Sequence, residues 1–140
     1  MKLDQALVDA ATDFLNKRFS KSDEWVGAAA MYSEDGQIFI STAPDGINES
    51  ASLCHETGAI CDAYKENKRI TASVCISRDD EGIVHILTPC GVCQERLMFW
   101  GDTVEVAVPK GNDSTMWETK TLAEVQPYYW YKPFQKKEDL

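Results

Sequence analysis

Residues 83–93 read IVHILTPCGVC, and within this stretch a strand pattern gives way to a helix start. Residues 83–87 form a largely apolar run of strand length. Thr88 is a favourable N-cap residue, and Pro89 suits the first helical position because its missing N–H would have no partner there. Gly101 suits the end of this helix. A strand that leads directly into a helix is typical of an α/β fold.

The same alternation of strands and helices extends over the rest of the chain. An amphipathic helix comes first, with apolar residues between Leu3 and Leu15 at spacings of three and four. Turn-forming residues follow one strand at 33–36, and residues 42–51 form a loop rich in Pro, Gly, Asn and Ser. The order predicts a three-layer α/β/α sandwich with a mixed sheet. The further elements predicted are strands at 27–32, 37–40, 71–76 and 103–108, a turn at 79–82, and helices at 53–65 and 121–125.

Length and charge limit the class of protein. The chain has 140 residues, which predicts a single domain over 1–140. Neither a run of about 18 apolar residues nor a signal-peptide pattern is present, so we expect a cytoplasmic protein. With 14 Lys and Arg against 23 Asp and Glu, the net charge is −9, which disfavours nucleic acid as a partner. We expect residues 136–139 to form a solvated end.

The five cysteines are unevenly distributed. An odd number of thiols in a reducing compartment disfavours a disulfide framework. Cys54, Cys90 and Cys93 stand at two predicted helix starts, where the positive end of the helix dipole favours thiolate. Three thiolates suit one Zn²⁺ and leave its fourth position open, which is typical of a catalytic site. Cys61 and Cys75 lie inside a predicted helix and strand, and we predict that both are core thiols.

A carboxylate accompanies the first of these cysteines. Glu56 follows Cys54 by two residues, in the first turn of the predicted helix, where it is placed to shuttle protons beside a metal-bound water. Residues 54–56 (Cys-His-Glu) and 89–93 (Pro-Cys-Gly-Val-Cys) fit the signature of zinc-dependent nucleobase deamination, with Cys where some relatives have His. A C-x-x-C pair also occurs in redox sites and closed zinc knots, so these remain alternatives.

On these residues the chain resembles the cytidine deaminase family, especially its short branch of blasticidin S deaminases and related nucleoside deaminases. Supporting matches are residues 26–29, residues 35–39, and residues 121–127 with the aromatic tail that follows. The resemblance implies the three-layer α/β/α fold and a homotetramer with composite active sites. It also implies one Zn²⁺ per subunit and hydrolytic deamination of a cytosine nucleoside, as in pyrimidine salvage.

The resemblance also implies a role for each motif residue. The three motif cysteines would bind zinc, which would lower the pKa of a bound water toward about 7. Glu56 would take a proton from that water, deliver it to N3 of the ring, and later pass a proton to the leaving amino group. Backbone groups around His55, Thr88 and Pro89 would hold the exocyclic amine and the ring. The products would be the uracil form and ammonia.

The chain departs from the family pattern near the metal motifs. The usual Ala between Cys and Glu is His55 here, either a substrate contact or a partly exposed residue without a role. Many nucleoside-specific members have Arg just after the Glu and just after the last Cys, where this chain has Thr57 and Gln94. Arg96 is either a substitute for them or an ordinary surface residue.

Other departures concern the sugar and the aromatic residues. The family's Asn-x-Glu pair aligns with residues 43–45, Ala-Pro-Asp, of which Asp45 can still accept a bond from a sugar hydroxyl. Trp25 is either a stacking face for the substrate or a core residue. We expect the aromatic tail to pack at a subunit interface, with Trp130 or Phe134 near the pocket.

Three hypotheses for function follow. The first is a deaminase of a free cytosine nucleoside: cytidine, deoxycytidine or a blasticidin S-type analogue. The second is a tRNA or polynucleotide deaminase, which would need a basic groove and a stacking surface that the net charge of −9 disfavours. The third is a catalytically inactive zinc-binding scaffold, against which the presence of Glu56 argues.

Overall fold

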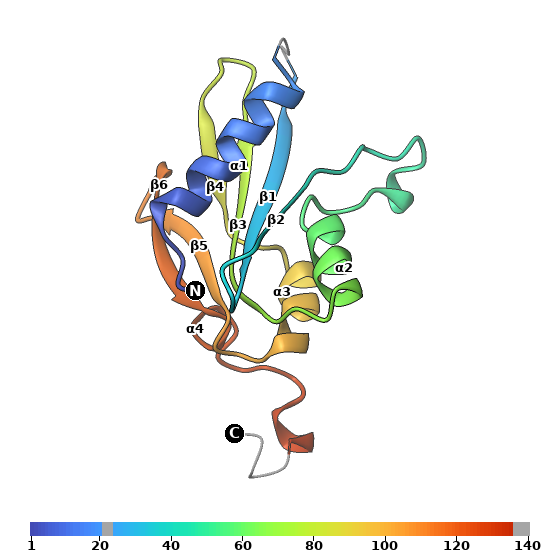
Figure 1. Ribbon diagram of the computed structural model, residues 1–140, viewed down its shortest axis with the longest axis vertical. Helices are drawn as coiled ribbons and strands as arrows, with labels where there is room; N and C mark the ends of the chain where they lie inside the picture. The colour runs from blue at the N-terminus through green and yellow to red at the C-terminus, as the bar shows by residue number, and fades with distance from the viewer. Residues whose placement is uncertain (21–23, 136–140) are drawn as a thin grey trace.

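The computed structural model describes residues 1–20 and 24–135 (Figure 1). Within these residues the elements follow the predicted order, and they confirm an α/β fold with a mixed sheet. No described helix has the length and apolar character needed to cross a membrane. The solvated end expected at 136–139 lies outside the described residues. The strands are β1 (Val26–Ser33), β2 (Ile38–Ser41), β3 (Ile70–Arg78), β4 (Val84–Leu87), β5 (Glu105–Lys110) and β6 (Asp113–Thr121). The α-helices are α1 (Gln5–Arg18), α2 (Thr57–Lys65), α3 (Gly91–Leu97) and α4 (Leu122–Val125).

The order of the strands brings β4 next to the middle of the sheet. The path through the sheet is β2-β1-β3-β5-β6, and β4 pairs with β3 off this path. The start of β3 runs parallel to β5, with Ala72 opposite Glu105. The end of β3 is antiparallel to β4, with Cys75 opposite Leu87. Because Leu87 ends β4, the segment that leads to α3 leaves the sheet beside the centre of β3.

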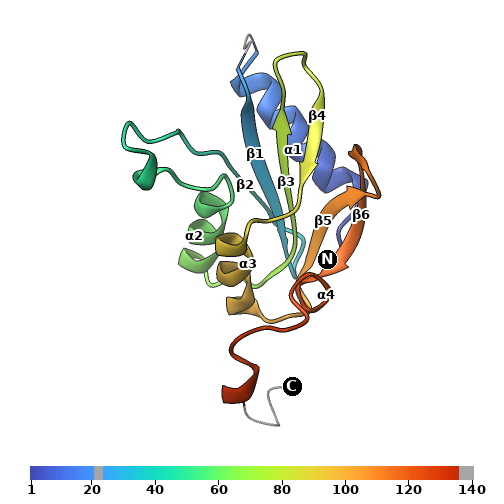
Figure 2. The same ribbon diagram turned by 180° about the vertical axis from the view of Figure 1, so that it is seen from behind.

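Different helices cover the two faces of the sheet. Figures 1 and 2 show α1 on one face and α2 with α3 on the other. Side chains alternate along a strand, so Ala30 of β1 belongs to the core under α1, whereas Met31 belongs to the core under α2 and α3. Leu7 and Leu15 of α1 are completely buried. This arrangement is the three-layer sandwich predicted from the sequence.

The helix expected at 53–65 begins later, at Thr57. Residues 52–54 are not helical, and a turn at 55–56 precedes the helix. The carbonyl of His55 accepts a hydrogen bond from the Ser41 hydroxyl, which ties the turn to β2. Tertiary contact with the sheet therefore outweighs the helical pattern at this end.

The helix expected to be capped by Thr88 begins at Gly91, so that prediction was wrong. Cys90 is its N-cap, and the Cys90 carbonyl accepts the Gln94 N–H at 2.9 Å. The carbonyl of Pro89 accepts instead from the Gln94 side-chain amide, at 2.7 Å. Thr88 and Pro89 therefore lie in a non-helical segment between β4 and α3, and the Pro89 carbonyl is occupied by the Gln94 side chain.

Two further predictions concern residues whose surroundings only the fold reveals. Cys75 is buried in β3, as predicted, but Cys61 is exposed and is not a core thiol. The buried face of α2 consists of Ala59 and Ala63, and Cys61 lies between them in sequence on another face of the helix. Strand β6 has mostly exposed side chains, so no apolar alternation marks it in the sequence.

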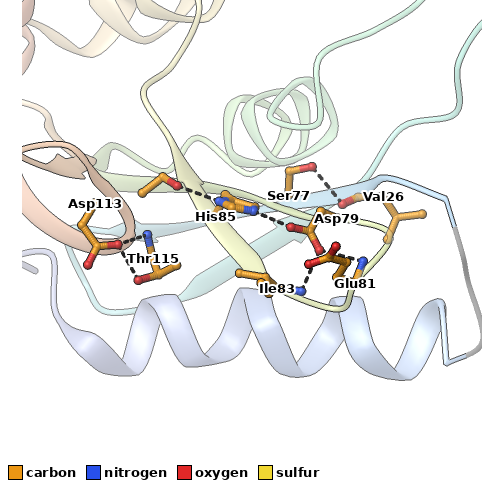
Figure 3. Close-up of polar contacts among 9 residues, drawn as sticks. Val26, Ser77, Asp79, Glu81, Ile83, His85, Asp113 and Thr115 are labelled. Carbon is orange, nitrogen blue, oxygen red and sulfur yellow. Dashed lines mark hydrogen bonds and ion pairs between the residues drawn. The ribbon is translucent and has the colours of Figure 1, made fainter.

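A polar network fastens the turn between β3 and β4 (Figure 3). One carboxylate oxygen of Asp79 accepts the backbone N–H groups of Glu81 and Ile83, both at 2.9 Å. The other oxygen lies 2.8 Å from Nε2 of His85, whose Nδ1 lies 2.6 Å from the Ser114 hydroxyl on β6. The hydrogen bond from His85, followed by the Ile83 N–H, holds the pKa of Asp79 below its ordinary value.

We expect Asp79→Asn to lower the thermal midpoint of unfolding at pH 7 by a few degrees. Because the folded-state pKa of Asp79 is depressed, its ionised form stabilises the fold above the unfolded-state pKa of about 3.9. That contribution disappears as the pH falls through the lower, folded-state pKa, so the difference between variant and wild type should shrink near pH 3. Thermal scans at both pH values measure it. Asp80→Asn, which removes the same charge from an exposed neighbour, is the control; equal effects of the two substitutions would refute the role of the network.

Candidate metal centre and active site

Three thiols from two segments meet at the carboxyl end of β4. Cys54 comes from the segment before α2, and Cys90 and Cys93 come from the start of α3. Their sulfur atoms all lie within 4.8 Å of one another, and the Cys54 and Cys90 sulfurs are 3.5 Å apart. The structure therefore brings together the three cysteines that the sequence singled out.

The thiol cluster fits a tetrahedral zinc ion. Since a Zn–S bond is about 2.3 Å long, two thiolates on one tetrahedral ion lie about 3.8 Å apart. Cys93 is buried, Cys54 is half-buried and Cys90 is exposed, so the cluster is held from the core side and open on the other. A donor set of three thiols with one open side can hold a metal ion and leave one coordination position for a ligand.

The electrostatics of the cluster differ from one thiol to the next. Burial raises the pKa of Cys93, and the negative charge of Glu56 adds to the effect. Burial also raises the pKa of Cys54, as does its hydrogen bond with Cys90. Burial opposes ionisation of Cys90 too, but hydrogen bonds from the Cys93 N–H and from Cys54 outweigh it and lower the pKa of Cys90. The directions differ among the three thiols, and a bound cation favours the thiolate form of each.

Glu56 lies beside the thiols in a small cavity, called here the thiol hollow. Glu56 is the N-cap of α2 and is only 3% exposed. The hollow has a volume of about 180 Å³. A buried carboxylate facing a metal-binding cluster has the position required of a proton carrier. The residues that line the hollow are Cys54, His55, Glu56, Cys75, Leu87, Thr88 and Cys90.

Cys75 is a member of this site that sequence analysis assigned to the core alone. It is 5% exposed on β3 and lines the thiol hollow opposite the end of β4. Burial raises the pKa of the Cys75 thiol, and the charge of Glu56 raises it further. The thiol therefore stays protonated. Its position in a buried strand carries no local motif, and only the pairing of β3 with β4 places it at the site.

A second cavity, of about 360 Å³, lies on the other side of His55. It brings together Trp25, Asp45 and His55, three of the residues predicted to contact substrate. Trp25 is 60% exposed and stacks on His85 with ring centroids 5.6 Å apart, so its interpretation as a core residue was wrong. Arg18, at the end of α1, also lines this cavity; the amphipathic pattern of α1 gave no sign of such a role.

No protein-family model and no curated protein sequence matches the chain. The crystal structure of the cytidine deaminase from Bacillus anthracis superposes on it with a TM-score of 0.83. The two sequences are 42% identical over 93% of this chain and 91% of that chain. The chain belongs to the cytidine deaminase family.

More distant structures show the same fold. The cytidine deaminase from Mycobacterium leprae has a TM-score of 0.71 at 22% identity, over 90% of this chain and 99% of its own. The enzyme from Burkholderia pseudomallei has a TM-score of 0.69 at 19% identity, over 92% and 100% of the two chains. These structures confirm the α/β sandwich predicted from the sequence, and the Bacillus anthracis structure confirms the family resemblance.

Within this family member, Arg96 reaches the residue that follows Glu56. Its Nη1 donates to the Thr57 hydroxyl at 2.9 Å, and its side chain is half-buried between α3 and α2. Thr57 is one of the two positions where many nucleoside-specific members of the family have Arg. The contact places a cation next to the start of α2, and the role of Arg96 as a substitute stays a prediction.

Trp130 and Phe134 lie in the tail after α4. Neither residue is among the described residues that line the thiol hollow or the second cavity. The indole N–H of Trp130 donates to Glu95 of α3 at 3.1 Å, and the Tyr129 hydroxyl binds the same carboxylate at 2.8 Å. Trp130 and Phe134 are 62% and 67% exposed. Figure 2 shows this tail running past α3 at one end of the molecule. Contact of either ring with a pocket of another subunit stays a prediction.

Proposed function

We propose that this family member is a zinc-dependent hydrolytic deaminase of free cytosine nucleosides. The observation that carries the proposal is the thiol hollow, where the buried carboxylate of Glu56 lies beside Cys54 and Cys90 of the three-cysteine metal-binding cluster. A purely structural zinc site would not need a carboxylate there. Membership of the cytidine deaminase family supports the same activity.

The residues of the hollow have distinct roles in the proposed reaction. Cys54, Cys90 and Cys93 would hold the zinc ion, which supplies a Lewis acid able to make hydroxide available at neutral pH. Glu56 carries a proton to N3 of the cytosine ring and then to the amino nitrogen on C4. One water is consumed, the C4–N bond breaks, a C4–O bond replaces it, and ammonia leaves. The nearby Cys75 stays neutral and adds no charge to that of Glu56.

Two features favour a small substrate over a polynucleotide. The net charge is −9, and a groove that follows a phosphate backbone requires clustered Lys and Arg. The second cavity adjoins the thiol hollow through His55 and has room for the sugar of a nucleoside. Deamination of cytidine, deoxycytidine or a blasticidin S-type analogue fits this arrangement. One zinc per subunit, the homotetramer, the role in pyrimidine salvage and the cytoplasmic location stay predictions.

Loss of ultraviolet absorbance, together with ammonia release, tests the proposed function directly. Zinc-loaded protein is incubated with cytidine, deoxycytidine, cytosine and blasticidin S. We expect turnover of at least one of the nucleosides, and a preference among them of several orders of magnitude would identify the substrate. Fully loaded protein that deaminates none of the nucleosides would overturn the proposal and favour the inactive zinc-binding scaffold.

A further inference from the structure

His55 stands between the two cavities. It lies between Cys54 and Glu56 in sequence, and it lines both the thiol hollow and the second cavity. Its ring is half-buried. A substrate with its base beside Glu56 and its remaining part in the second cavity would therefore pass the imidazole ring.

The hydrogen bonds of the ring determine its tautomer. Nδ1 of His55 accepts the backbone N–H of Ala43 at 3.3 Å. A backbone N–H can only donate, so Nδ1 must be unprotonated, and the neutral ring carries its proton on Nε2. The Thr42 hydroxyl, 3.5 Å from Nδ1, donates to the Gly27 carbonyl at 2.6 Å, so it does not compete for this nitrogen.

The edge that carries Nε2 lies over Gly27. A Cβ atom at position 27 would lie 2.5 Å from both Cδ2 and Nε2 of His55, so only glycine leaves room for the ring in this position. Gly27 itself lines the second cavity. Among the described residues, none is hydrogen-bonded to Nε2. The N–H of this nitrogen is thus a donor at the wall of the cavity that has no partner among the residues the structure describes.

We propose that His55 is a specificity-determining residue whose Nε2–H donates to a sugar hydroxyl of the substrate. The inference rests on the proposed function and concerns how the sugar of the substrate is recognised. Asp45 lines the same cavity and offers an acceptor. A hydroxyl group both donates and accepts, so a sugar can use the carboxylate and the imidazole together. A site of this kind rejects ligands that leave its polar groups unpaired.

Two substitutions of His55 distinguish the acceptor role of Nδ1 from the donor role of Nε2. In His55→Asn, the amide oxygen can replace Nδ1 as the acceptor for Ala43, but the donor at Nε2 is lost. In His55→Gln, the longer side chain can place an N–H₂ near the position of Nε2, but the acceptor for Ala43 is lost. If donation to the sugar matters, His55→Asn should weaken binding of uridine, the expected product, by about tenfold. The affinity of His55→Gln for uridine should stay within about threefold of the wild-type affinity. The opposite order would show that His55 only holds the loop at 42–43, and it would overturn the inference.

Calorimetric titration of the zinc-loaded variants with uridine and with its 2′-, 3′- and 5′-deoxy forms completes the test. If His55 donates to one hydroxyl, the penalty of His55→Asn should vanish for the probe that lacks this hydroxyl. An undiminished penalty with all three probes overturns the inference. Zinc content and thermal midpoint confirm that each variant is folded and loaded. Because binding is measured without turnover, a protein that shows this pattern but releases no ammonia would refute the proposed function alone.

Discussion

Glu56→Ala is expected to lower the rate of ammonia release by about 10²- to 10⁴-fold, the usual contribution of a positioned general acid–base. Zinc should stay bound, because the three thiols that would hold it come from Cys54, Cys90 and Cys93. Glu56 is 3% exposed and is the only carboxylate among the described residues that line the thiol hollow. Ammonia release and zinc content, measured on the same preparation, check both parts of the prediction.

Two further variants make this result specific. Glu56→Gln keeps the shape of the side chain but cannot accept and return a proton, so it should be as inactive as the alanine variant. Glu118→Ala removes an exposed carboxylate from β6 and should retain wild-type activity. Substantial turnover by the zinc-loaded Glu56→Gln protein would show that another group carries the proton.

Cys93→Ala is expected to abolish zinc binding and, with it, the activity. Cys93 is fully buried in the first turn of α3, and its thiol is one of the three that would hold the ion. Metal affinity contributes to folding stability, since the ion binds the native state. We therefore expect the thermal midpoint to fall by on the order of 10 °C relative to the zinc-loaded wild type. Elemental analysis and thermal scans measure the two effects.

Cys61→Ala provides the matched control, because Cys61 is an exposed thiol on α2. It should keep its zinc, its activity and its thermal midpoint. A chelator added to the wild-type protein should lower the midpoint toward that of Cys93→Ala. If Cys93→Ala retains a full equivalent of zinc, the ion binds elsewhere and the three-cysteine site is refuted.

The residues of the metal site could be predicted from the sequence because their spacing is local. Cys90 and Cys93 are separated by one helical turn, and Glu56 follows Cys54 by two residues. Such spacings survive any error in the helix ends. In the structure α2 begins at Thr57, later than predicted, and the N-cap of α3 is Cys90 where Thr88 was predicted. The three thiols nevertheless lie close together.

The cavity beside the site could not be predicted in the same way. Arg18, Trp25 and Asp45 come from the end of α1, the start of β1 and a loop, and only the packing of these segments brings them to one cavity. Periodicity reports which face of an element is apolar, but it does not report which distant element covers that face. For this reason the core interpretation was wrong for both Trp25 and Cys61.

The sequence by itself determined the layered α/β fold, the three thiols and the carboxylate, because each depends on hydrophobic period or short-range spacing. The tertiary structure decided what surrounds them. The register of β3 against β4 brought Cys75 to the hollow, and the approach of Ala43 to Nδ1 left the proton of His55 on Nε2. Both outcomes depend on contacts between segments far apart in the chain, and no local pattern encodes such contacts.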